Sequence, residues 1–263
     1  KIMCGIAGIY HLASQPMPDL ERRLNVMNHI QRHRGPDGQG SWVHPHGHVG
    51  FAHRRLSIID LTTGDQPMHD RGGNWIIYNG EIYNYNVLRE ELLGLGHFFR
   101  GANDAEVMLA TIRQWGLETA VTRFNGKFAL ALWDGEERRL HLVRDRLGVK
   151  PLYFGWVNRT LVFGSELKAL RTYPGFSAEI DRNALTLFLR YGYIPTPYSI
   201  YRGVHKLTPG QIVTIWPGSE AGDERVETYW SPRVAVEKGI TSPFKGDESA
   251  ALEVLESLMT RSI

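Results

Sequence analysis

The chain has 263 residues, of which 42% are hydrophobic and 22% charged, as in a globular protein with a buried core. Its net charge of +2 gives no strong field of either sign, so we expect neither a nucleic acid nor a membrane as partner. No apolar run reaches the ~20 residues of a membrane-spanning helix, no signal peptide is visible and the single cysteine excludes an intrachain disulfide, so we expect a soluble cytoplasmic protein.

The first half of the chain carries both strand and helix signals. Small apolar residues separated by glycines predict a buried strand over 4–10. Residues 74–78 predict a strand that breaks at Asn79-Gly80. A hairpin is predicted with arms near 41–44 and 49–53. Apolar residues at helical spacing predict helices from Asp19 to the turn formers at 33–38, from Asn84 to Gly94, and from Asp104 to Gly116.

The second half begins with two predicted hairpins, 128–134 with 139–144 and 152–157 with 160–163. Weaker signals predict a helix at 185–189, a strand at 211–216, a polar linker at 217–223 and a terminal helix from Asp247. That last helix carries an apolar stripe, which either packs back on the same domain or meets a partner domain. Several hairpins with a few helices predict an α+β domain of helices on antiparallel sheets.

Cys4 is the first candidate catalytic residue, because it is the only cysteine and Gly5 follows it directly. If Cys4 were the first residue, its α-amine, with an ordinary pKa of ~8, could accept the thiol proton. A lone cysteine with apolar neighbours is more often an inert core residue. The catalytic interpretation therefore depends on the residues that accompany it.

Seven further motifs follow Cys4 in a fixed order: RGPDG at 34–38, HRRLSI at 53–58, YNGEIYN at 78–84, DAE at 104–106, NGKFALALWD at 125–134, RDRLGVKPLY at 144–153 and SELKAL at 165–170. Together they resemble the class II glutamine amidotransferase domain of glutamine-hydrolysing asparagine synthetases, an N-terminal-nucleophile hydrolase. The resemblance implies a four-layer α/β/β/α sandwich. It implies an amidotransferase domain over 4–217, with 218–263 as the linker and first helix leading to an ATP-dependent synthetase domain.

The resemblance also implies a chemistry for L-glutamine. Cys4 would attack the side-chain amide, release ammonia and leave a thioester that water converts to glutamate. The Asn79 side chain and the Gly80 N–H would stabilise the oxyanion. Without the resemblance, Asn79-Gly80 is an ordinary hairpin turn.

Further positions correspond to the substrate pocket of the family. Arg55 would bind the α-carboxylate as a planar, bidentate cation. Glu81 and Asp104 would bind the α-ammonium, and backbone groups at Leu56, Ile58 and Ile59 would complete the pocket. The alternatives are a surface charge for Arg55, a solvated acid for Glu81 and a helix N-cap for Asp104.

Other residues of the motifs are assigned to ion pairs and turns rather than to catalysis: Arg34, Asp37, Arg144, Asp145 and Lys150. The alternating His44, His46 and His48 could suggest a metal site. Because Pro45 and Gly47 indicate a turn there, and no carboxylate or cysteine completes a ligand set, we expect no metal.

Two departures from the family pattern affect function. Residues 1–3 precede Cys4, so its amine is in a peptide bond, and we expect the chain as written to be inactive until Cys4 is the N-terminal residue. The sequence contains neither the family's Ser-Gly-Gly-x-Asp-Ser pyrophosphate loop nor a P-loop. We therefore expect no cofactor in this chain, and ATP and Mg²⁺ only in the missing synthetase domain.

The expected partners are L-glutamine and that synthetase domain, in asparagine biosynthesis, and a homodimer is compatible with the resemblance. Two alternatives stay open. The domain could be catalytically silent, although Cys4, Arg55, Asn79, Glu81 and Asp104 are all retained. The ammonia acceptor could also be a carboxylate other than aspartate.

Overall fold

The computed structural model describes residues 3–13, 15–57 and 64–262, and the chain divides into two compact units, Lys1–Tyr229 and Trp230–Ile263. The domain boundary expected after residue 217 stays a prediction. Among the helices in the described ranges, none is long and apolar enough to cross a membrane.

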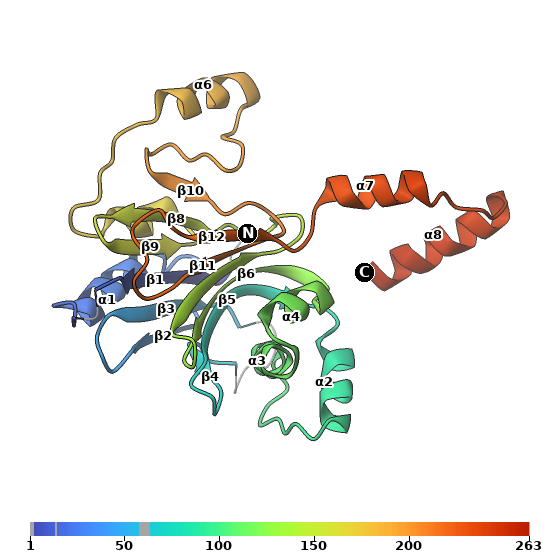
Figure 1. Ribbon diagram of the computed structural model, residues 1–263, viewed down its shortest axis with the longest axis horizontal. Helices are drawn as coiled ribbons and strands as arrows, with labels where there is room; N and C mark the ends of the chain where they lie inside the picture. Colours follow the sequence, from blue (N-terminus) through green and yellow to red (C-terminus); the bar gives the residue numbers. More distant parts are fainter. Residues whose placement is uncertain (1–2, 14, 58–63, 263) are drawn as a thin grey trace. The chain divides into compact units, whose positions relative to one another are not determined.

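Two antiparallel sheets form the centre of the first unit (Figure 1). Across the first sheet the described strands run β10 (Val204–Lys206), β8 (Tyr153–Val157), β9 (Thr160–Gly164), β1 (Gly5–His11), β3 (Val49–Arg55) and β2 (Gly38–Val43). Across the second they run β12 (Arg225–Thr228), β11 (Gln211–Ile215), β7 (Arg139–Arg144), β6 (Gly126–Asp134), β5 (Trp75–Ile82) and β4 (Met68–His69).

The two sheets pack face to face through a core of large side chains. Tyr10, Phe51 and Phe163 of the first sheet belong to one buried cluster with Ile77 and Trp133 of the second. Tyr10 meets Trp133 edge-on with ring centroids 5.6 Å apart, a favourable arrangement for two aromatic rings. This core fixes how the two sheets face each other.

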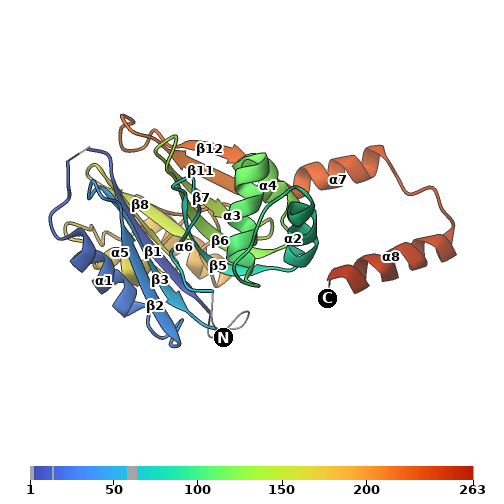
Figure 2. The same cartoon turned by 90° about the horizontal axis from the view of Figure 1, so that it is seen from below.

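Helices cover the outer faces of both sheets (Figure 2). Helices α1 (Leu20–Ile30) and α5 (Leu167–Arg171) bury their apolar faces against the first sheet. Helices α2 (Tyr85–Gly94), α3 (Asp104–Trp115) and α4 (Leu117–Arg123) form a cluster with the second sheet. The predicted α+β fold with four layers is therefore confirmed. Helix α6 (Arg182–Tyr191) lies beyond β10, at the top of Figure 1.

The central strand β1 shows why small residues occur in the first motif. It pairs with β3 on one side and with β9 on the other. A Cβ at Gly8 would lie 2.1 Å from the ring of Phe163, so glycine lets that ring cross the strand. The residues around Cys4 are thus held in the middle of a packed sheet.

One local prediction and one of the alternatives are wrong. Residues 79 and 80 do not form a turn, because β5 continues through them to Ile82 and pairs with β6 along its length. Asp104 is not the N-cap of α3, since Asn103 holds that position and its side chain accepts a hydrogen bond from the Glu106 N–H. Both differences bear on the pocket described below.

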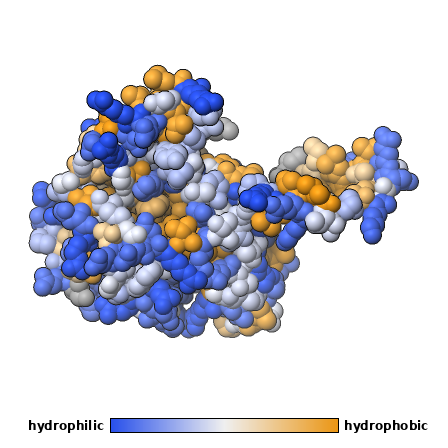
Figure 3. Space-filling view, turned by 45° about the horizontal axis from the view of Figure 1, so that its top comes forward, coloured by the Kyte–Doolittle hydropathy of each residue, from blue (hydrophilic) through white to orange (hydrophobic). Residues whose placement is uncertain are grey.

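The second unit contains α7 (Pro232–Thr241) and α8 (Glu248–Ser262). Helix α8 agrees with the predicted terminal helix, whereas α7 was not predicted. Apolar side chains are visible on the surface of this unit (Figure 3). Its exposed apolar residues include Val236, Ile240, Leu252 and Leu255.

Candidate active site

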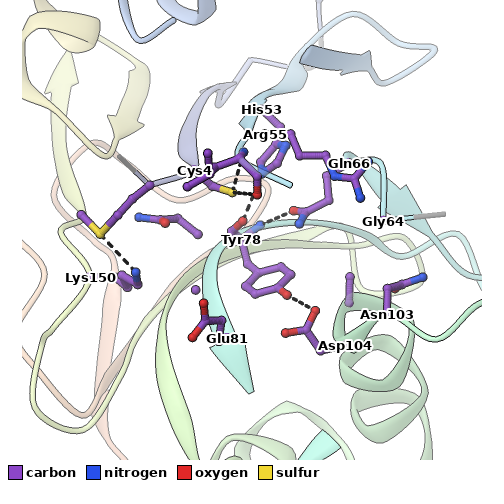
Figure 4. Close-up of a pocket in the computed structure, with 15 residues that line it drawn as sticks. Cys4, His53, Arg55, Gly64, Gln66, Tyr78, Glu81, Asn103, Asp104 and Lys150 are labelled. Atoms are coloured by element: carbon purple, nitrogen blue, oxygen red, sulfur yellow. Dashed lines mark hydrogen bonds between the residues drawn. The ribbon is translucent and has the colours of Figure 1, made fainter. Parts of the chain in front are cut away.

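Cys4 lies directly before β1, beside a pocket formed by both sheets and the start of α3 (Figure 4). The pocket brings together the predicted site residues Cys4, Arg55, Leu56, Asn79, Gly80, Glu81 and Asp104. Ile58 and Ile59, also predicted, lie outside the described residues. Residues far apart in the sequence thus meet around one thiol.

The Cys4 thiol contacts the backbone of Leu56. The Leu56 N–H donates to Sγ over 3.3 Å, and the thiol lies 3.6 Å from the Leu56 carbonyl oxygen. Burial raises the pKa of the thiol, and the Leu56 N–H and the cationic Lys150 and Arg55 only partly counteract this. Because the buried thiol keeps its proton, a nearby base must remove that proton before sulfur can attack.

The carbonyl oxygen of Cys4 is held from two sides. Arg34 Nε donates to it over 3.0 Å. With the amide oriented to suit its neighbours, Asn79 Nδ2 donates to the same oxygen over 3.2 Å, and Asn79 Oδ1 accepts from Arg34 Nη2 over 3.3 Å. Arg34 is fixed in turn by Glu166, 3.1 Å away. Arg34 therefore supports the nucleophile directly, which is more than the general scaffolding role that we predicted.

Asn79 and Gly80 are placed by strand pairing. Gly80 lies opposite Phe128 of β6, and a Cβ at Gly80 would lie 2.2 Å from the Lys127 carbonyl oxygen. Glycine is thus required by the close approach of the neighbouring strand. Asn79 is only 1% exposed, so its side chain is fixed beside Cys4.

Two carboxylates lie at the other side of the pocket. Asp104 is buried and accepts hydrogen bonds from the Tyr78 hydroxyl and, over 3.2 Å, from the Ile82 N–H. Burial raises the pKa of Asp104, and these two hydrogen bonds partly offset that effect. Glu81 lies 3.1 Å from Lys127 Nζ. This side of the pocket can receive a cationic group.

Arg55 ends β3 and supplies a buried guanidinium to the pocket. Its Nη1 lies 2.9 Å from Oδ1 of Asp65, whose side chain is 84% exposed. A carboxylate from the chain itself therefore sits against Arg55. The guanidinium can bind a carboxylate in this position.

Several pocket residues were not predicted as part of the site: His53, Gln66, Tyr78, Asn103 and Lys150. His53 is buried and donates from Nε2 to the Tyr78 carbonyl over 3.2 Å, and burial lowers its pKa to about 3. Gln66 Oε1 accepts from the Tyr78 N–H over 2.6 Å. His53 and Tyr78 are in quoted motifs, but sequence alone does not show that a strand turns these side chains toward Cys4.

Lys150 was assigned to scaffolding, yet its Nζ lies in the pocket, 3.1 Å from Met3 Sδ. Arg144 and Asp145 do act as scaffold. Arg144 Nε donates to the Lys150 carbonyl over 2.8 Å, and Asp145 Oδ2 accepts from the Lys150 N–H over 3.1 Å. Burial lowers the pKa of Lys150. The cation is therefore positioned where it can influence the Cys4 thiol.

Comparison with known proteins agrees with this arrangement. Residues 3–230 match the glutamine amidotransferase domain family. The chain is 40% identical over 231 residues to asparagine synthetase [glutamine-hydrolyzing] 1 of Bacillus subtilis, covering 87% of this chain and 35% of that protein. It is 37% identical over 216 residues to asparagine synthetase [glutamine-hydrolyzing] 3 of the same organism, covering 81% and 34%. The chain thus spans about a third of the length of these relatives.

Among solved structures, the fold resembles that of an allosteric regulatory enzyme of purine biosynthesis. The TM-score is 0.63 at 18% identity, and the match covers 86% of this chain and 49% of that one. At this identity the likeness concerns the fold alone. It agrees with the two packed sheets and their outer helices.

Proposed function

This chain belongs to the class II glutamine amidotransferase family, and from that premise we propose that it hydrolyses the side-chain amide of L-glutamine with Cys4 as nucleophile. One observation carries the proposal. A thiol, a buried amide, a guanidinium and two carboxylates converge on a single pocket, at Cys4, Asn79, Arg55, Glu81 and Asp104.

In the proposed reaction the α-amine of an N-terminal Cys4 takes the thiol proton, and sulfur attacks the amide carbon. The tetrahedral intermediate collapses, the amine returns the proton to the leaving nitrogen, and ammonia departs from a thioester. Water then adds to the thioester, giving glutamate and restoring the thiol. Two observations support the amine as base. Burial raises the thiol pKa, and among the described pocket residues the one imidazole, His53, is fully buried with Nε2 bonded to the Tyr78 carbonyl.

The oxyanion is assigned to the Asn79 side chain and the Gly80 N–H. Asn79 is buried next to Cys4 and fixed by Arg34, so its donor needs little rearrangement when charge develops. A donor held ready in this way typically lowers the barrier by ~3 kcal/mol.

The α-carboxylate of glutamine is assigned to Arg55, and the α-ammonium to Glu81 and Asp104. The buried guanidinium and the acidic pair support this orientation. Asp65 would have to leave Arg55 for the substrate carboxylate to enter. Backbone groups at Leu56, Ile58 and Ile59 are assigned to the same pocket.

The ammonia is proposed to serve an ATP-dependent synthetase domain of the asparagine-synthetase type. The two named relatives support this assignment, since each is a longer protein with that name. ATP and Mg²⁺ would act in that domain. Aspartate is the acceptor that those names suggest, and another carboxylate remains the alternative.

Activity is proposed to need cleavage of the bond between Met3 and Cys4, because an amide nitrogen cannot act as base. The test compares the printed chain with a form that begins at Cys4, measuring glutamate and ammonia released from L-glutamine. We expect turnover in the Cys4-first form, none in its C4A variant, and little in the printed chain.

Turnover by an intact printed chain would contradict the role of the amine. If the folded Cys4-first form is inactive, the synthetase portion of a longer relative is added to it. This addition distinguishes a glutaminase that needs a partner domain from a catalytically silent domain. Restored turnover would indicate a glutaminase that depends on its partner domain. Continued inactivity would refute the proposed function and favour a silent domain.

A further inference from the structure

The turn that joins β2 to β3 gathers three imidazoles. We expected Pro45 and Gly47 to make a turn rather than a ligand set, and the turn is present. It is closed by the Gly47 N–H, which donates to the His44 carbonyl over 2.7 Å. The turn nevertheless brings His44, His46 and His48 together, with one potential ligand nitrogen from each ring within 4.8 Å of the others.

The three rings pack as one cluster. The ring centroids of His44 and His48 are 4.7 Å apart, and those of His44 and His46 are 5.0 Å apart. The rings of His44 and His48 each lie 5.6 Å from Trp133, which supports them from the second sheet. Two of the three rings are thus held against the protein, and of the three residues only His46 is classed as exposed.

His48 supplies a second, independent observation. The residue is 4% exposed, yet its Nδ1 has no hydrogen-bond partner among the described residues. A buried imidazole nitrogen without a partner is unfavourable and calls for an explanation.

We propose that His44, His46 and His48 bind one divalent transition-metal ion of the zinc class, through one nitrogen of each ring. Three imidazoles suit zinc, whereas Mg²⁺ and Ca²⁺ prefer oxygen ligands. Because the group contains no carboxylate or cysteine from the described residues, water would complete the coordination.

The geometry needs only a small adjustment. A zinc–nitrogen bond of about 2 Å puts tetrahedral ligand atoms roughly 3.3 Å apart. Nitrogens that now lie within 4.8 Å of one another must therefore approach by at most about 1.5 Å. Rotation of the exposed His46 side chain can supply much of that movement. The His46 N–H donates to His44 Nδ1 over 3.1 Å. If the metal takes that nitrogen, the exposed N–H can turn to water instead.

One nearby charge acts against the ion. The positive charge of Arg138 acts on His44 and His48. Its repulsion would weaken binding of a cation. The affinity must therefore come from the three imidazoles, so removal of any one ring should weaken binding of the ion.

The site lies away from Cys4. His48 directly precedes β3, and Arg55, which lines the Cys4 pocket, ends that strand. Seven residues of extended chain span roughly 20 Å. The metal would therefore link the residues of the β2–β3 turn to one another and would not enter the glutaminase chemistry, so this proposal is independent of the proposed function.

The test is titration of the metal-free full chain with ZnCl₂ in a calorimeter. We expect saturable binding of one Zn²⁺ per chain, weakened at least about tenfold in H46A. His46 is exposed at the tip of the turn, so its loss should leave the fold intact. The matched control is H29A, which removes another exposed histidine outside the cluster and should bind zinc like the parent.

A second probe reports ligand chemistry. Added Co²⁺ should give the intense visible absorption of low-coordinate cobalt with the parent and H29A, and lose it with H46A. Zinc should raise the Tm of the parent and H29A but not of H46A. Absence of saturable zinc binding, equal binding by H46A and H29A, or a spectrum of hydrated six-coordinate cobalt would each overturn the proposal.

Discussion

Asn79 Nδ2 donates to the carbonyl oxygen of Cys4 over 3.2 Å, so a side chain from the second sheet holds the residue directly before β1 of the first sheet. The apolar core also joins the two sheets, as does the hydrogen bond from His53 of β3 to the Tyr78 carbonyl of β5. The polar link from Asn79 to Cys4 lies at the rim of that core, where the pocket opens. The position of the nucleophile therefore depends on the packing of one sheet on the other.

That link leads to a prediction for N79A in the Cys4-first form. Loss of an oxyanion donor should lower kcat a few hundredfold, corresponding to ~3 kcal/mol, with a much smaller change in KM. Steady-state ammonia release measures both constants. N25A removes an exposed asparagine on α1 and serves as control. An N79A enzyme that keeps its kcat while its KM rises would make Asn79 a substrate-binding residue.

The ion pair between Asp65 and Arg55 leads to a prediction about the KM for glutamine. The Asp65 carboxylate lies 2.9 Å from Arg55 Nη1, where the substrate carboxylate is proposed to bind. The pair competes with substrate, but Asp65 is 84% exposed and solvent screening keeps such a pair below ~1 kcal/mol. D65N should therefore lower the KM for glutamine up to about fivefold and leave kcat unchanged. D19N, which removes the exposed partner of Arg22, should change neither. A higher KM in D65N would show that Asp65 helps substrate bind.

The buried thiol predicts how stability varies with pH. Burial raises the pKa of Cys4 above its ordinary value of 9.0, so the folded chain holds this proton more tightly than the unfolded chain. The resulting stabilisation is present below pH ~9 and is lost as the pH rises through the folded pKa. Urea unfolding of the printed chain and of C4A across this range should show the parent losing stability relative to C4A. If the free energies of unfolding of the parent and C4A changed in parallel with pH, the pKa of the thiol would not differ between the folded and unfolded chains.

The pKa of the Cys4 thiol can also be measured directly from its rate of alkylation. The alkylation rate of the single cysteine by iodoacetamide should rise with a midpoint above 9.0 in the folded printed chain. Lys150 lowers this pKa by its charge, so K150M should move the midpoint further up. K168M, which removes an exposed lysine beside Glu166, should leave it in place.

Much of the fold could be predicted from the sequence, because it depends on local patterns. The hairpin of β6 and β7 and helices α1 and α3 follow from alternating or helical apolar spacing. Short elements such as α4 and α5 were missed, since contacts with the sheets rather than local pattern stabilise them. The residues that surround Cys4 could be named from the ordered motifs, but the contacts of Arg34 and Lys150 with that region depend on tertiary packing.

Asn79 and Gly80 illustrate this limit. An Asn-Gly pair is a strong turn signal when only neighbouring residues are considered. In the fold, β6 passes so close to β5 that residue 80 has no room for a side chain. The glycine that looked like a turn former is a packing requirement. Its local signal was real, but a long-range contact determined the structure.

G80A tests that explanation. A Cβ at residue 80 would lie 2.2 Å from the Lys127 carbonyl oxygen and 2.6 Å from Phe128 Cα, and backbone atoms cannot move aside as a side chain can. We expect G80A to destabilise the fold by about 1–3 kcal/mol, as overpacking does, and to impair turnover because Asn79 shifts with the strand. G94A is the matched control, since nothing lies within 4 Å of a Cβ at that position. Urea unfolding of both variants measures the difference. If G80A were as stable as G94A, the close approach of β6 would not be what requires glycine at this position.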